Sequence, residues 1–276
     1  MADPNQRIAV STWSLHRYLG TVYPHDLNND AIGEGDDRYG EGEESLLGLP
    51  SVLANHGYDR LEIVSFHLRS RDPVYLGELR DQLQVSGVTL QTLLIDAGDM
   101  TDPVHGPRDT RWIAGWIDVA NALGAQNARI IAGKQKPTPE TISRSVAGFR
   151  QLLAANAGSP LKLVTENWFD LLSTPAAVHE LLDRLEGQVG LLADFGNWTG
   201  PDKYEDLKSI FPRASLCHAK AGFVSGRLDE VDYGLCVGAA EEAGYRGPYT
   251  LIFDAEHPGE WAGLAQERDF ILSRLQ

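Results

Sequence analysis

Cysteine is scarce in this chain, and long apolar runs are missing. The 276 residues include only two cysteines, Cys217 and Cys236. Two cysteines cannot build a disulfide framework, and this pair lacks the close spacing of a redox or zinc motif. No apolar run approaches the roughly 18 residues that a membrane-spanning helix needs. The first residues show no basic region followed by an apolar stretch, so we expect no secretory signal and a cytoplasmic protein.

Positive charge is also in short supply. The chain has 24 Lys and Arg residues against 39 Asp and Glu residues, which gives a formal net charge of −15. A field of that sign repels phosphate backbones and anionic lipid surfaces. We therefore expect neither nucleic acid nor a membrane as a partner, and a small-molecule substrate instead. Hydrophobic residues make up 42% of the chain, which is enough to bury a sizeable core.

Short apolar, β-branched runs alternate along the chain with longer amphipathic stretches. This alternation is typical of parallel βαβ units, and several runs (ARIIA, LKLV, VGLLA) are almost continuously apolar, as strands covered on both faces are. Eight such units predict an α/β fold, a single (β/α)8 TIM-barrel domain over residues 1–276. A doubly wound open sheet is the alternative, but no Gly-rich dinucleotide-binding turn follows the first run. The expected strands are 8–13, 60–66, 89–95, 128–132, 162–166, 189–194, 215–220 and 249–254.

An acidic insertion at about residues 20–45 follows the first expected strand. It carries a run of Asp and Glu residues between Asp26 and Glu44. The simplest interpretation is a solvated acidic loop. A loop after a barrel strand lies at the carboxyl end of the barrel, where barrel active sites are found, so a lid is the functional alternative.

Four expected strands end in residues that bind metal ions. Glu166, Asp194, His218 and Asp254 each follow an apolar strand pattern, and they lie on consecutive strands in the second half of the chain. Three carboxylates and one imidazole suit a divalent ion with mainly oxygen ligands, such as Mn²⁺ or Mg²⁺, and Co²⁺ or Zn²⁺ also tolerates this set. A single strand-end carboxylate is as often a helix cap or a surface charge. Four together favour a shared cation, which would remove the cost of burying them.

Five short motifs around these residues resemble those of a known family. They are GYDRLEI at the second expected strand, TEN at the fifth, ADFGN at the sixth, CHAK at the seventh and GYRGPYTL before the eighth. In this order and spacing the chain resembles the xylose-isomerase-like barrels, also called the sugar phosphate isomerase/epimerase or endonuclease-IV-like superfamily. The resemblance covers most of the chain. It implies one divalent metal held by Glu166, Asp194, His218 and an acidic residue of the last strand.

The last strand departs from the family pattern. Sugar epimerases of this type usually have Glu at the position of Ile252, so Asp254 is the ligand that we predict and Glu256 the fallback. Those epimerases use two metal-bound glutamates on opposite faces of the sugar, one to remove a proton and one to return it. Here the second glutamate is missing. One-base enolisation, dehydration or a metal-assisted hydride shift therefore stays open.

Further residues at the carboxyl ends of the strands are candidates for catalysis and substrate binding. Lys220 lies on the same face as His218 and would stabilise a developing oxyanion, or it forms an ordinary salt bridge. Trp residues after strands stack on sugar rings or simply pack. Asp96, Asp99 and His16 are weaker candidates, since each is explained equally well by capping or packing. The predicted catalytic residues are Glu166, Lys220 and Asp254, and the predicted substrate-binding residues are Trp13, Glu62, His67, Trp168, Asn197 and Glu256.

These observations predict a divalent-metal-dependent sugar isomerase or epimerase acting on a monosaccharide or a polyol-derived ketone. The expected metal is Mn²⁺, with Mg²⁺, Co²⁺ or Zn²⁺ as alternatives. A metal-dependent lyase, such as an inosose-type dehydratase, and a non-catalytic barrel that binds a sugar or partner are the other hypotheses. A repair endonuclease is disfavoured by the charge and by the small number of histidines at strand ends. Many relatives form dimers or tetramers, so the resemblance leaves a homo-oligomer open.

Overall fold

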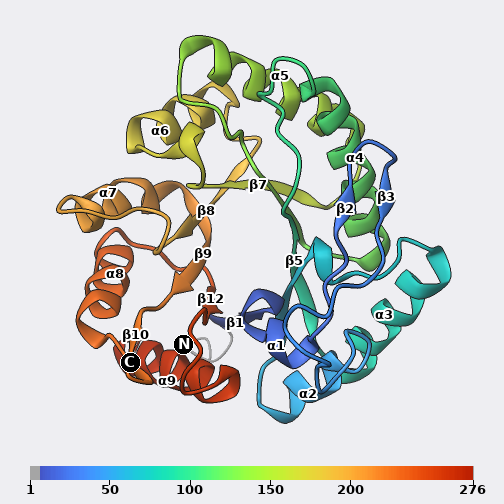
Figure 1. The fold of residues 1–276 in the computed structure, drawn as a ribbon. Helices are drawn as coiled ribbons and strands as arrows, with labels where there is room; N and C mark the ends of the chain where they lie inside the picture. Colours follow the sequence, from blue (N-terminus) through green and yellow to red (C-terminus); the bar gives the residue numbers. More distant parts are fainter. Residues whose placement is uncertain (1–6, 276) are drawn as a thin grey trace.

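A closed barrel of parallel strands forms the centre of the computed structural model, which describes residues 7–275 (Figure 1). Each barrel strand pairs with the next one along the chain, and the last strand pairs with the first, in the order β1-β12-β9-β8-β7-β6-β5-β4. This topology confirms the predicted (β/α)8 barrel. The strands are β1 (Ile8–Ser11), β4 (Arg60–Val64), β5 (Thr89–Ile95), β6 (Asn127–Ile130), β7 (Lys162–Glu166), β8 (Gly190–Asp194), β9 (Ala214–Lys220) and β12 (Tyr249–Ile252).

Helices surround the barrel on its outer side (Figure 1). Thr138 and Thr174 begin two of them: each side chain accepts a hydrogen bond from the helix backbone, and proline occupies the next position. None of the described helices is long and apolar enough to cross a membrane. The helices are α1 (His16–Leu19), α2 (Leu49–Asn55), α3 (Pro73–Ser86), α4 (Gly106–Leu123), α5 (Pro139–Ala155), α6 (Pro175–Arg184), α7 (Lys203–Ile210), α8 (Glu230–Glu242) and α9 (Glu260–Arg274).

Four strands end earlier than the sequence predicts. β1 ends at Ser11, β4 at Val64, β6 at Ile130 and β12 at Ile252, so the predicted ends at residues 13, 66, 132 and 254 are wrong. Single 3₁₀ turns follow β1 and β4, at Thr12–Leu15 and Ser65–His67, and two more lie at Asp170–Leu172 and Phe211–Arg213. The period of two that orients strand side chains therefore does not reach the residues beyond these ends.

An apolar layer inside the barrel supports the carboxyl end of the strands. Strands β4, β5, β7, β8 and β9 each contribute one buried side chain to it, and Trp13 and Phe66 pack against this layer. In a parallel barrel, a residue two positions further along the same strand faces the same side. Val164 and Leu192 of the layer thus lie two residues before Glu166 and Asp194. The layer is Val64, Leu94, Val164, Leu192 and Leu216.

The acidic segment is folded against the body of the protein. It contains a two-stranded hairpin of β2 (His25–Asp26) and β3 (Ala31–Ile32), near α3 and α4 in Figure 1. The backbone N–H of Tyr23 donates to the carbonyl of Phe66 at 2.7 Å, and the ring of His25 packs 4.7 Å from the ring of Trp116. Strands β10 (Phe223–Val224) and β11 (Arg227–Leu228) form a second short hairpin.

Candidate metal centre

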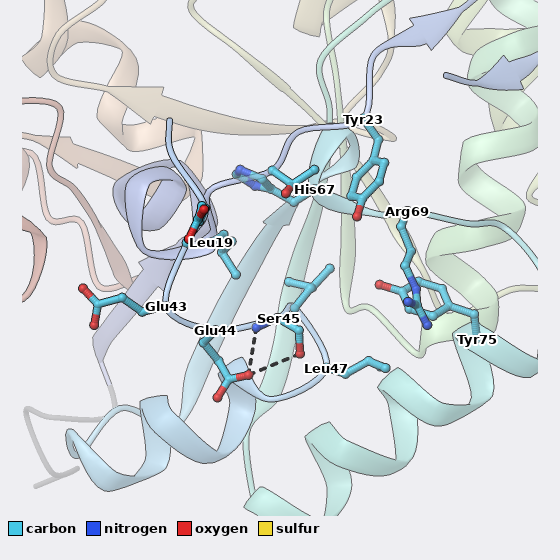
Figure 2. Close-up of a pocket in the computed structure, with 13 residues that line it drawn as sticks. Leu19, Tyr23, Glu43, Glu44, Ser45, Leu47, His67, Arg69 and Tyr75 are labelled. Carbon is cyan, nitrogen blue, oxygen red and sulfur yellow. Dashed lines mark hydrogen bonds between the residues drawn. The ribbon is translucent and has the colours of Figure 1, made fainter. Parts of the chain in front are cut away.

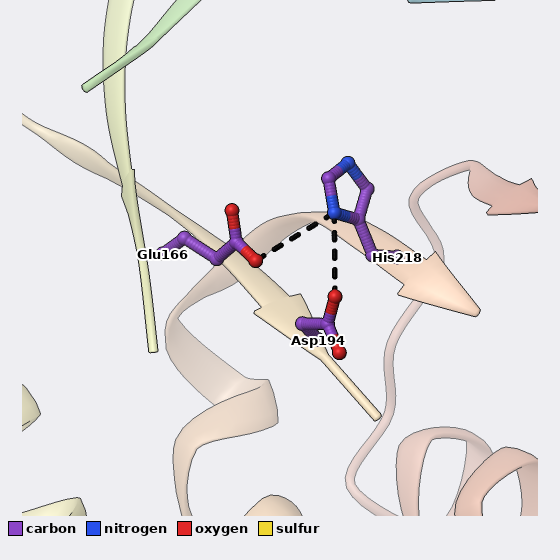
Figure 3. Close-up of side chains that lie close together, drawn as sticks. All are labelled: Glu166, Asp194 and His218. Carbon is purple, nitrogen blue, oxygen red and sulfur yellow. Dashed lines mark ion pairs between the residues drawn. The ribbon is translucent and has the colours of Figure 1, made fainter. Parts of the chain in front are cut away.

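Three of the four predicted metal ligands converge at the carboxyl end of the barrel. Glu166 ends β7, Asp194 ends β8 and His218 lies near the end of β9, and all three side chains are buried. One ligand atom from each lies within 4.8 Å of the others. Figure 3 shows Nδ1 of His218 facing both carboxylates, at 3.4 Å from Oδ2 of Asp194 and 3.7 Å from Oε1 of Glu166. We call these three residues the ligand cluster.

Asp254 is not brought into the ligand cluster. It lies two residues beyond the end of β12, is exposed, and accepts a hydrogen bond from Nζ of Lys220 at 2.9 Å. The sequence argument extended strand periodicity to residue 254, whereas the strand ends at Ile252. Ile252 itself is buried and lines the cavity above the cluster. The fallback residue, Glu256, is exposed and lies in a different hollow of the surface.

Glu62 lies inside the barrel beneath His218 and is fully buried. Its Oε2 is 2.8 Å from Nε2 of His218, and its Oε1 accepts hydrogen bonds from Gln91 and Thr92 at 2.9 and 2.7 Å. The carboxylate is covered, both its oxygens are engaged and it does not line the cavity over the ligand cluster, so its expected contact with substrate stays a prediction. An acceptor at Nε2 places the imidazole proton there and leaves Nδ1 free to ligate a metal.

Arg129 is a site residue that sequence reasoning missed. Its guanidinium is buried on β6, where Nε lies 3.1 Å from Oε2 of Glu166 and a second nitrogen pairs with Asp96. The same guanidinium lies 5.1 Å from the centre of the Trp168 ring. The signal was present in the run ARIIA, because a charged residue inside a buried strand needs a partner of opposite charge.

The electrostatics of the cluster favour positive charge. Burial by itself would raise the pKa of Glu166, but Arg129 and His218 outweigh burial and lower it to about 2. Burial would lower the pKa of His218, but the carboxylates of Glu62 and Glu166 outweigh burial and raise it well above its ordinary value. The buried carboxylates therefore favour positive charge between them, and a proton on the imidazole or a divalent ion would supply it.

A cavity of about 90 Å³ lies over the ligand cluster. Trp13, Trp168, Asn197 and Lys220, all predicted from the sequence, line it together with Asp96. The four predicted residues therefore lie where a small substrate in the cavity would contact them. Their roles in substrate binding and catalysis stay predictions.

Two of the lining residues are held in place by specific contacts. Nδ2 of Asn197 donates to Oε1 of Glu166 at 2.7 Å, so this amide orients a ligand carboxylate. A side chain at Gly196 would place its Cβ 2.7 Å from Cδ of Lys220, so the absence of one leaves room for the lysine stem.

Three other candidates lie away from this cavity. His67, a predicted substrate-binding residue, is buried after β4 and lines a neighbouring cavity (Figure 2) instead of the one over the ligand cluster. It is the last residue of the 3₁₀ turn that follows β4. Asp99 accepts hydrogen bonds from the backbone N–H and hydroxyl of Thr101 and stabilises a local turn. The ring of His16 stacks on that of Tyr39 at 4.1 Å.

Comparison with known proteins gives a consistent picture of the fold. The family model described as xylose isomerase-like TIM barrel matches residues 50–273. No curated protein matches the chain. Eight solved structures that resemble it are only 11–17% identical, which is evidence for a shared fold alone.

Three of these structures illustrate the likeness. D-allulose 3-epimerase from Methylomonas sp. is 16% identical, with a TM-score of 0.68 and 98% of each chain covered. A xylose isomerase-like TIM barrel protein from Mycobacterium smegmatis, in complex with magnesium, is also 16% identical, with a TM-score of 0.68 and 100% of each chain covered. 3-keto-D-glucoside 4-epimerase from E. coli is 15% identical, with a TM-score of 0.62, covering 84% of this chain and 95% of its own.

Proposed function

The chain belongs to the xylose isomerase-like TIM barrel family, and from this premise we propose that it is a divalent-metal-dependent isomerase or epimerase. Its substrate is a monosaccharide or a polyol-derived ketone. The observation that carries the proposal is the convergence of Glu166, Asp194 and His218 at the carboxyl end of the barrel, under a cavity lined by two tryptophans. Two of the solved structures of similar fold are sugar epimerases, and this supports a sugar as the substrate.

The residues present fit a divalent cation. Two buried carboxylates side by side repel each other unless a cation lies between them. The second nitrogen of the ligand imidazole is occupied by a buried carboxylate, as in many metal sites. Glu166, Asp194 and His218 would hold the ion, and the remaining coordination positions would be open to water or substrate. Oxygen-rich ligation favours Mn²⁺ or Mg²⁺ over softer metals, and we propose Mn²⁺.

The chain's own residues suggest how a proton is moved. A bound divalent ion would act as a Lewis acid that acidifies the carbon next to a substrate carbonyl. Glu166, with a pKa of about 2, is a weak base and serves as a ligand. Asp96 lines the cavity, and its burial raises its pKa, so it is the cavity carboxyl best suited to accept and return a proton. The Lys220 ammonium, held by Asp254, would stabilise negative charge on a substrate oxygen.

The last strand favours a second candidate function. Ile252 occupies the cavity wall where a second metal-bound glutamate would be needed for two-base epimerisation. A lyase that removes water from a ketone needs only one base and the same metal. The two reactions are separated by product mass, because dehydration removes one water and isomerisation leaves the mass unchanged.

The experiment that tests the proposal begins with elemental analysis of the purified protein. Addition of Mn²⁺ to the chelated protein is expected to raise the Tm by mass action, and Asp194→Ala is expected to abolish that rise. Turnover is then followed by mass spectrometry on a panel of monosaccharides, ketoses and inososes. Activity that survives complete chelation, or an Asp194→Ala variant with full metal-dependent stabilisation, would overturn the proposal. Metal binding without turnover of any compound would favour the non-catalytic barrel.

A further inference from the structure

One oxygen of each carboxylate in the ligand cluster approaches the imidazole. Oε1 of Glu166 lies 3.7 Å and Oδ2 of Asp194 lies 3.4 Å from Nδ1 of His218, and the dashed lines of Figure 3 end on these two oxygens. All three residues line the cavity over the ligand cluster, which we call the metal cavity. The contacts of the other two oxygens decide how many donors the protein offers to an ion in this cavity.

The second oxygen of Glu166 faces Arg129 and not the metal cavity. Oε2 lies 3.1 Å from Nε of this guanidinium, and both atoms are fully buried. Neither has a hydrogen-bond partner within the described residues, so each is the charge partner of the other. Oε1 accepts a hydrogen bond from Nδ2 of Asn197 at 2.7 Å. The carboxylate is therefore held on both sides, with Oε1 toward the ligand cluster and Oε2 toward Arg129.

The second oxygen of Asp194 is engaged by the backbone. Oδ1 accepts a hydrogen bond from the N–H of Gly196 at 2.5 Å. The main chain of Asp194 is fixed as well, because the buried amide of Asn167 accepts from its N–H at 2.7 Å and donates to its carbonyl at 3.2 Å. The position of this ligand is thus set by four atoms of the backbone and one amide, which leaves it little freedom to turn.

A site with one donor atom from each of three residues suits a small ion. Ca²⁺ takes about six to eight oxygen ligands and often binds a carboxylate through both oxygens. Mn²⁺ is a first-row transition ion, and such ions accept mixed nitrogen and oxygen ligands. Ligand number and rigidity separate ions of different size. The arrangement therefore disfavours Ca²⁺, and it does so through the groups that engage the second oxygens.

We propose that Arg129 is a specificity-determining residue, which limits Glu166 to binding through one oxygen and thereby selects Mn²⁺ over Ca²⁺. This inference rests on the proposed function, because it takes Glu166 as a metal ligand. Without the guanidinium, Oε2 would be a buried polar atom with no partner, and rotation of the carboxylate toward the ion would supply one. The additional oxygen benefits Ca²⁺ more than Mn²⁺, since Ca²⁺ needs the larger number of oxygen ligands.

The ratio of two affinities tests the proposal. Chelated wild-type protein is titrated with Mn²⁺ and with Ca²⁺ in competition with a fluorescent chelator that binds both ions. We expect Mn²⁺ to bind roughly a hundredfold more tightly than Ca²⁺, or more. Similar affinity for the two ions would overturn the selectivity and leave the proposed metal centre standing. Binding of neither ion would overturn both.

A double variant removes the guanidinium without changing the net charge of the metal cavity. Arg129→Met combined with Asp96→Asn deletes one cation and the carboxylate with which it pairs. We expect the ratio of Mn²⁺ to Ca²⁺ affinity to fall about tenfold, because Oε2 of Glu166 becomes available to the ion. Circular dichroism checks that the variant is folded. An unchanged ratio in the folded variant would contradict the role of Arg129.

Lys220→Met is the control for charge. It removes a cation from the same cavity, but the partner of Lys220 is Asp254, so no oxygen of a ligand carboxylate is released. A nearby positive charge repels all divalent ions alike, so we expect this variant to bind both ions more tightly with the ratio unchanged. A ratio that falls as far as in the double variant would show that charge sets the preference and not the number of donors.

Infrared spectroscopy tests the same point on the wild-type protein, with no variant required. A carboxylate that binds a metal through one oxygen has widely separated stretching bands, and one that binds through both oxygens has closely spaced bands. Difference spectra between Mn²⁺-loaded and chelated protein are expected to show the wide separation for every carboxylate band that the ion shifts. Closely spaced bands would mean that Glu166 or Asp194 binds through both oxygens, and the proposal would then fail.

Discussion

Nε2 of His218 lies 2.8 Å from Oε2 of Glu62, across the interior of the barrel. The two residues are 156 positions apart in the chain, and no pattern in the sequence predicts that they pair. Their pairing orients the imidazole so that Nδ1 faces Asp194 and Glu166. If the proposed metal binds there, Glu62 would act on it through His218.

The first prediction concerns this buried pair. Glu62→Gln retains the shape of the side chain but removes the negative charge that supports the ligand imidazole. We expect Mn²⁺ affinity to fall about ten- to hundredfold with the fold retained, measured by competition with a fluorescent chelator. Glu180→Gln, on the exposed face of α6, is the matched control. Equal Mn²⁺ affinity in the two variants would show that Glu62 has no role at the metal.

The second prediction concerns the buried ion pairs of Arg129. Arg129→Met leaves the carboxylates of Asp96 and Glu166 without their buried partner, so the free energy of unfolding is expected to fall by about 3–5 kcal/mol. Combining Arg129→Met with Asp96→Asn removes one of the two unpaired buried charges. The double variant is therefore expected to recover part of the lost free energy of unfolding. Urea unfolding of the two single variants and the double variant gives the coupling energy. Strictly additive losses would mean that Arg129 and Asp96 do not stabilise each other.

The third prediction concerns the apolar residue at the end of β12. Ile252→Glu places a carboxylate on the wall of the metal cavity, where a bound cation would attract it. We expect the variant to be less stable than wild type without metal and to gain more in Tm from Mn²⁺. Ile252→Gln, of equal size but uncharged, should lose stability without the extra gain. The same Mn²⁺ response in both variants would argue against a metal near this strand end.

The fourth prediction concerns the pH dependence of stability. Burial lowers the pKa of His67 from 6.5 to about 3 in the folded state. Between these values the unfolded chain binds a proton that the folded protein does not, so this residue makes stability fall as the pH is lowered below about 6.5. The slope is up to about 1.4 kcal/mol per pH unit.

His67→Asn removes this titration, so the difference in unfolding free energy between wild type and variant should change between pH 6.5 and pH 4. This difference also cancels the contributions of other titrating groups. One of them is Glu267, whose pKa is raised by burial, so that its contribution to stability changes with pH in the opposite direction. A difference that is independent of pH would mean that His67 is not buried as a neutral group.

Sequence periodicity predicted the position of site residues that lie within strands, but not of those that lie beyond the strand ends. Glu166, Asp194 and His218 were predictable because each lies within a regular strand, at or near its end, where periodicity alone decides the side that a residue faces. Asp254 was misplaced because β12 ends before it, so strand periodicity does not set its direction. His67 lies in the 3₁₀ turn after β4, where periodicity gives no direction either. Trp13 lies in such a turn too, although packing on the apolar layer keeps it at the cavity.

Local chemistry along the chain therefore determined the alternation of strands and helices, the closure into a barrel and the row of polar residues at the strand ends. These features depend on interactions between near neighbours and on burial patterns that repeat along the sequence. Tertiary structure alone decided that Glu62 supports His218, that Arg129 pairs with Glu166, and that Asp254 binds Lys220 instead of joining the ligand cluster. Those choices are made between strands far apart in sequence, where the free energy depends on distances and burial that exist only once the barrel has closed.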